Sequence, residues 1–77
     1  MSVTDLKNYG RVCGESPMLE TEVRKIGLDN IEGQIKHSRS LGFEWDGDSL
    51  KALASEMEIQ GELSEKDYEK IFLRKGD

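Results

Sequence analysis

The chain has 77 residues, of which 16 are acidic and 11 basic, so its formal net charge is −5. This length allows one small domain, and because 35% of the residues are charged, its hydrophobic core must be small. The negative charge argues against a DNA- or RNA-binding protein, because contact with phosphates requires a basic face.

Two further features indicate where the protein works. No apolar run is longer than three residues, as in Ile71-Phe72-Leu73, so we expect neither a membrane-spanning helix nor a secretory signal. The single cysteine, Cys13, has no partner for a disulfide within the chain. We therefore expect a cytoplasmic protein that does not bind membranes.

The periodicity of the apolar residues predicts helices and no strands. β-branched residues are scarce, and no stretch alternates apolar with polar residues over the length of a strand. Ser2 to Asp5 has the S-x-x-D pattern of a helix start, and apolar residues at helical spacing follow. We expect this first helix to run to about Cys13 and to end at Gly14.

Two more helices are expected in the middle of the chain. Ser16 and Pro17 are typical of an N-cap and a first helical position, and the helix that they begin should end at Gly27. Asp29 to Glu32 has the D-x-x-E pattern of a third start. This third helix has a thin apolar stripe and should end at Gly42.

An extended segment follows, in which Phe43 and Trp45 are two residues apart and therefore point to the same side. Both rings are expected to pack on the helices. Asp46 or Asp48 should cap a fourth helix, which Gly61 should end.

The last helix lies in residues 62–76, beginning at the S-x-x-D pattern of Ser64 to Asp67 and ending at Gly76. Each expected helix is shorter than an isolated helix needs to be in water, so the helices must pack on one another. We predict an all-α fold, a small bundle of four to five short helices in a single domain, residues 1–77.

No motif for catalysis or for metal binding is complete. The stretch from Asp46 resembles the start of an EF-hand loop, but Lys51 and Met57 occupy the positions that require glycine and glutamate. Cys13 and His37 are too few for a zinc site, so we expect a buried thiol and a solvated imidazole. We predict no catalytic residue, no metal and no cofactor.

Binding is the remaining class of function. The last helix has an apolar stripe, which either completes the core or docks in a groove of a partner. The rings of Phe43 and Trp45 likewise either complete the core or contact a partner. The candidate partner-binding residues are Leu63, Tyr68, Ile71, Phe72, Phe43 and Trp45.

The order of these features is similar to that of a known family. A short first helix containing Leu6 and Tyr9 is followed by the acid-Ser-Pro turn of residues 15–17, then by Gly42-Phe43-Glu44-Trp45 and an acidic helix start. Over residues 2–53 this resembles the Nif-eleven family of small leader-type domains, found in cyanobacteria and diazotrophs. The resemblance implies a helical domain that a modifying enzyme grips.

The C-terminal part of the chain resembles the family in one segment and departs from it in the next. Residues 62–67 look like the segment that, in many members, leads to a double glycine where a protease releases a modified core peptide. Here the sequence reads Phe72-Leu73-Arg74-Lys75-Gly76-Asp77, with bulky residues where small ones are expected. This departure argues against the cleavage function and leaves the expected fold unchanged.

Our first functional hypothesis is a non-enzymatic binding or regulatory module that a larger cytoplasmic protein recognises, or that regulates that protein, through docking of the last helix in a groove. The second is the leader of a ribosomally synthesised, post-translationally modified peptide. The third is an acidic inhibitor that mimics nucleic acid. The sequence predicts no particular oligomeric state.

Overall fold

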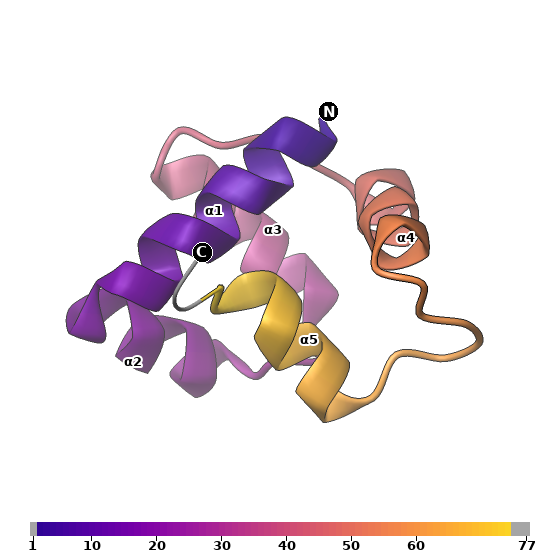
Figure 1. The fold of residues 1–77 in the computed structure, drawn as a ribbon. Helices are drawn as coiled ribbons and strands as arrows, with labels where there is room; N and C mark the ends of the chain where they lie inside the picture. Colours follow the sequence, from indigo (N-terminus) through magenta and orange to yellow (C-terminus); the bar gives the residue numbers. More distant parts are fainter. Residues whose placement is uncertain (1, 75–77) are drawn as a thin grey trace.

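The computed structural model describes residues 2–74, which form a bundle of five helices and contain no strand (Figure 1). The predicted small all-α bundle is therefore confirmed. The last helix ends at Phe72, before Gly76, where it was expected to end; Gly76 itself lies outside the described residues. The helices are α1 (Val3–Glu15), α2 (Pro17–Ile26), α3 (Ile31–Ser40), α4 (Gly47–Glu56) and α5 (Glu65–Phe72).

Each helix begins at a side chain that accepts a hydrogen bond from a free backbone amide of its first turn. Asp46 and Ser64 form capping boxes, in which the side chain of the third helical residue also accepts a hydrogen bond from the backbone amide of the cap residue. The third helix is capped by Asn30 rather than by Asp29, so that prediction is wrong by one residue. The five caps are Ser2, Ser16, Asn30, Asp46 and Ser64.

Helix α1 is the element on which the bundle is assembled. Helices α2, α4 and α5 pack against it, and α3 packs against α2 (Figure 1). The core therefore lies between α1 and the helices around it. Its buried hydrophobic members are Leu6, Tyr9, Cys13, Val23, Leu28, Trp45, Leu50, Leu53, Ile71, Phe72 and Leu73.

Two glycines of α1 allow α5 to approach closely. The helix does not end at Gly14, as expected, but continues to Glu15. A Cβ atom at Gly14 would lie 2.8 Å from the backbone nitrogen of Arg74, and one at Gly10 would overlap the carbonyl oxygen of Ile71. The backbone amide of Arg74 donates to the carbonyl oxygen of Gly10 at 3.0 Å. Gly10 and Gly14 are therefore contact positions, where glycine is required because it has no side chain.

A polar network is buried between α1 and α3. Gln34 is fully buried; its Nε2 donates to the carbonyl oxygens of Val23 and Gly27, and its Oε1 accepts from the Tyr9 hydroxyl at 2.6 Å. Because that bond uses the only phenolic hydrogen, the 2.9 Å contact of the Tyr9 hydroxyl with His37 Nδ1 places a hydrogen on Nδ1. His37 is half-buried and its Nδ1 is hydrogen-bonded, so the imidazole is less exposed to solvent than expected.

Three aromatic rings meet at the centre of the core. The ring centroids of Tyr9, Trp45 and Phe72 lie 5.5–6.1 Å apart. Trp45 also donates from Nε1 to the hydroxyl of Ser38 at 2.7 Å, so its one polar atom is satisfied. Tyr68 stacks on the outer side of Phe72. The aromatic cluster therefore joins α1, α5 and the segment before α4.

Candidate functional site

Three of the six residues predicted to bind a partner belong to the core. Ile71 and Phe72 are fully buried and Trp45 is 2% exposed, so none of them offers a surface to a partner. Their assignment as docking residues is corrected. The reason is that α5 packs on α1 at Gly10, and the chain directly after α5 lies on Gly14. This packing buries the second half of the apolar stripe of α5.

The other three are half-buried, at the edge of the core. Phe43 packs against the core from the segment after α3, where its backbone amide and carbonyl bond to Ser38. Leu63 and Tyr68 line one groove, which Phe43 does not reach. The structure thus brings two of the six candidates, Leu63 and Tyr68, together in a surface hollow.

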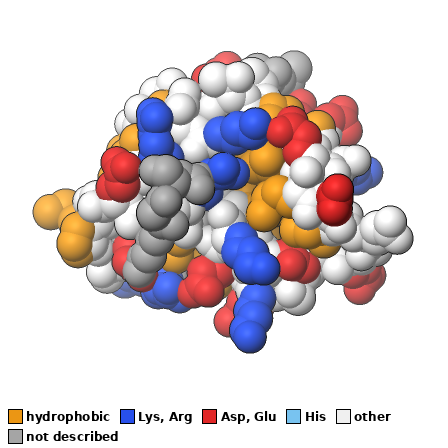
Figure 2. Space-filling model, in the orientation of Figure 1, with side chains coloured by type: hydrophobic (Ala, Val, Ile, Leu, Met, Phe, Trp, Pro, Cys, Tyr) orange, Lys and Arg blue, Asp and Glu red, His pale blue; other side chains and the backbone are white. Residues whose placement is uncertain are grey.

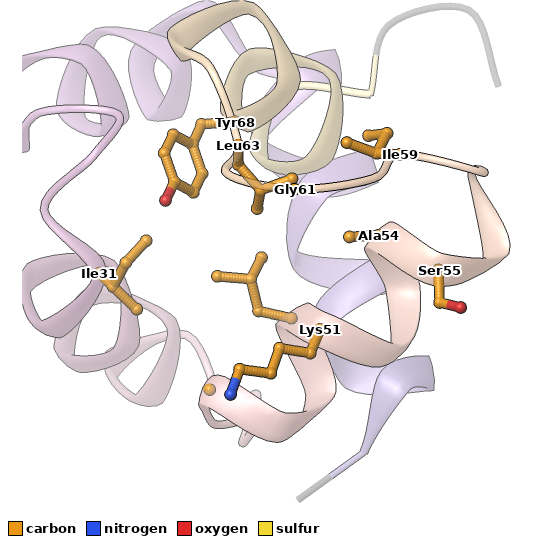
Figure 3. A pocket seen from close by; sticks show the side chains of 10 residues that line it. Ile31, Lys51, Ala54, Ser55, Ile59, Gly61, Leu63 and Tyr68 are labelled. Carbon is orange, nitrogen blue, oxygen red and sulfur yellow. The ribbon is translucent and has the colours of Figure 1, made fainter.

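We name this hollow the α4–α5 groove. It has a volume of about 390 Å³ and runs between the start of α3, one side of α4, the connection that follows α4, and α5 (Figure 3). Its lining residues are Ile31, Gly47, Leu50, Lys51, Ala54, Ser55, Ile59, Gly61, Leu63 and Tyr68.

The α4–α5 groove exists because α4 and α5 both pack on α1. The connection between them, residues 57–64, turns through positive φ angles at Glu58 and Gly61. It thereby carries Ile59 and Leu63, two apolar side chains outside any helix, to the edge of the groove. These apolar residues in a charged loop are the signal by which the sequence could have indicated the groove.

The chemistry of the α4–α5 groove is mainly apolar. In Figure 3 the side chains of Ile31, Leu63 and Tyr68 face one another across the opening, and Lys51 extends along one edge with its ammonium group. The Tyr68 hydroxyl and the Ser55 hydroxyl are the other polar side-chain groups of the lining. Such a hollow suits the side chain of an apolar ligand, with few polar contacts at its margin.

A second hollow, of about 410 Å³, lies over the first half of α1 and is polar and basic. It is lined by Thr4, Lys7, Asn8, Arg11 and Arg74, and Figure 2 shows basic side chains over α1. Lys7 forms an ion pair with Glu56 at 2.9 Å, and Arg11 donates to Asn8. Lys7 and Arg11 are therefore already bonded to neighbouring side chains of the same chain.

The two side chains considered for metal binding and nucleophilic chemistry, Cys13 and His37, lie on α1 and α3. Within residues 2–74, no three histidine, cysteine or acidic side chains gather where they could hold a metal ion. Cys13 is buried, as predicted, and burial raises the pKa of its thiol to about 11. At neutral pH this sulfur is therefore a protonated packing group, which is unreactive as a nucleophile.

None of the helices in the described part of the chain is both long and apolar enough to cross a membrane. The chain matches no model of a protein family, no curated protein and no solved structure.

Proposed function

We propose that the chain is a non-enzymatic binding module and that the α4–α5 groove is its contact surface. A partner inserts an apolar segment between α4 and α5. The observation that carries this proposal is the convergence of apolar side chains from α3, α4, the connection and α5 on one open hollow. Hollows of this kind, with a few polar groups at the edge, are typical of binding sites.

The direction of docking differs from the hypothesis drawn from the sequence. There, the last helix enters a groove of the partner; in the present proposal the chain itself supplies the groove. The difference rests on α5, whose Ile71 and Phe72 are buried while Tyr68 and the preceding Leu63 remain at the surface. The resemblance to the Nif-eleven family supports a larger cytoplasmic protein as partner.

The leader of a modified peptide is the second candidate. It is favoured by the resemblance of residues 62–67 to the leader segment, because Leu63 of that segment lines the α4–α5 groove. On this hypothesis the partner is the modifying enzyme, and a core peptide is encoded after Asp77. Reading the gene beyond Asp77 and its neighbours distinguishes the two candidates.

The test uses a variant that fills the groove without disturbing the core. Gly47 lines the α4–α5 groove, and a Cβ built there meets no atom within 4 Å, so Gly47→Phe places a ring at the opening. Ala52→Phe adds the same ring to an exposed position of α4 outside the lining, and is the matched control.

A photocrosslinking amino acid replaces Leu63 in each background, and partners are captured from native lysate. We expect crosslinked partners with the unmodified chain and with Ala52→Phe, and their loss with Gly47→Phe. Helical circular dichroism should be the same in all three proteins. Equal crosslinking by both ring variants would exclude the α4–α5 groove as the contact surface.

A further inference from the structure

The acidic residues of this chain are concentrated in the part that builds the α4–α5 groove. Residues 44–69 contain nine acidic and two basic residues, whereas the rest of the chain contains seven acidic and nine basic ones. The negative charge of the whole protein is therefore due to this segment. Figure 2 shows acidic side chains on the side of the molecule where α4 lies.

Five exposed carboxylates are direct chain neighbours of lining residues. One of them, Glu56, forms an ion pair with Lys7; of the other four, three lie within residues 44–69 and Glu32 lies outside this segment. Each lies one residue, about 3.8 Å between Cα atoms, from a residue of the groove. Among the described residues, none of the four forms an ion pair, unlike Glu56 and Glu69. We call them the acidic rim: Glu32 beside Ile31, Asp48 beside Gly47, Glu58 beside Ile59, and Glu62 between Gly61 and Leu63.

From this arrangement we infer that the occupant of the groove is a basic amphipathic segment of a partner protein. Its apolar side chains enter the groove while its lysine or arginine residues face the acidic rim. The inference rests on the proposed function and adds the charge of the partner. Electrostatic complementarity of this kind selects among partners that have the same apolar anchors, because like charges at the margin repel.

The size of the groove limits how much of the segment is buried. A volume of about 390 Å³ is near the lower end of the range of about 300–1,000 Å³ for ligand pockets. It accommodates a few apolar side chains, which a helix presents at positions i, i+3 and i+4. Basic residues on either side of that stripe would then lie over the rim.

Reversing the charge of Lys51 should change the affinity for a basic ligand in the opposite direction from reversing a charge of the acidic rim. Lys51 is the one cation among the lining residues and would oppose a basic ligand. Lys51→Glu should therefore tighten binding, whereas Glu62→Lys should weaken it. Glu22→Lys, the same change at an exposed position of α2 that does not line the groove, is the control. All three positions are exposed, so the fold should tolerate these changes.

The probes are three synthetic peptides of equal length. The first has leucines at helical spacing with lysines between them, the second has the same leucines with glutamates, and the third keeps the lysines but replaces each leucine by glutamine. Binding to the whole chain is measured by fluorescence anisotropy at low and high salt. Amide chemical shifts of the isotope-labelled protein locate the site.

We expect the first peptide to bind about tenfold or more tightly than the other two and to shift the amides of Leu50, Ala54 and Leu63. Each charge reversal should change its Kd by about threefold, in the stated direction, and added salt should reduce the difference. Glu22→Lys should leave the Kd unchanged.

The remaining outcomes separate the two proposals. Equal binding of the lysine and glutamate peptides at the groove overturns the charge inference and leaves the proposed function standing. If the leucine-free peptide binds as tightly as the first peptide, charge attraction alone accounts for the binding and no apolar side chain enters the groove. That result overturns the inference. Absence of groove shifts with either leucine peptide overturns both proposals. Self-association of the chain through these amides shows that a second copy is the occupant, and overturns the inference.

Discussion

Replacing Gly10 by alanine should have two opposite effects on the free energy of unfolding. In the interior of an isolated helix, alanine is favoured over glycine by about 1 kcal/mol. In this fold, the added methyl group would overlap the carbonyl oxygen of Ile71 and lie 2.9 Å from the Cδ atom of Arg74. The first neighbour is backbone, so it yields only if α5 moves away from α1. We therefore expect a net loss of stability.

The size of the loss follows from the contacts that move. Overpacking against backbone costs up to about 3 kcal/mol, and separating the helices also weakens the hydrogen bond from the Arg74 amide to the Gly10 carbonyl, worth about 1 kcal/mol. Subtracting about 1 kcal/mol for helix propensity leaves a loss of up to about 3 kcal/mol. For a domain of this size, the upper limit corresponds to a Tm lower by about 12–24 °C.

Thermal denaturation followed by circular dichroism at 222 nm and by the fluorescence of Trp45 measures this change. The control is Gly47→Ala, at the first position of α4, where a Cβ meets nothing within 4 Å. That variant should be more stable by about 0.4–1 kcal/mol. A Tm of Gly10→Ala equal to or above that of the unmodified chain would refute the close contact of α1 with α5.

The buried network, the thiol and two helix starts give three more predictions. Tyr9→Phe leaves Gln34 Oε1 buried without its donor, so the free energy of unfolding should fall by about 1–3 kcal/mol in urea titrations; an unchanged midpoint would contradict the network. Burial raises the pKa of Cys13 from 9.0 to about 11, so the unfolded chain loses this proton first. The urea midpoint should therefore fall between pH 9 and 11, and less steeply in Cys13→Ala. Hydrogen bonds from backbone amides hold the pKa values of Asp46 and Asp67 below the ordinary 3.8, so stability should be lost as acid titrates them, with a weaker dependence in Asp46→Asn.

The sequence alone determined where most helices begin. A cap such as Ser16 or Ser64 bonds to amides within three residues, so its pattern is complete in a short stretch of chain. The apolar spacing likewise fixed the helical class. The ends were harder, as Gly14 shows, because a glycine in a helix reads as a stop unless the neighbour that requires it is known.

Only the tertiary structure decided which apolar residues face solvent. Leu63, Tyr68, Ile71 and Phe72 are alike in the sequence, yet the first two line a groove and the last two fill the core. Gln34 reads as a surface residue, and its partners lie 7 to 25 residues away. The lining of the groove comes from α3, α4, the connection after α4, and α5. Because each helix contributes only a few of these residues, the groove forms only when the helices pack together, and the sequence of one helix does not indicate it.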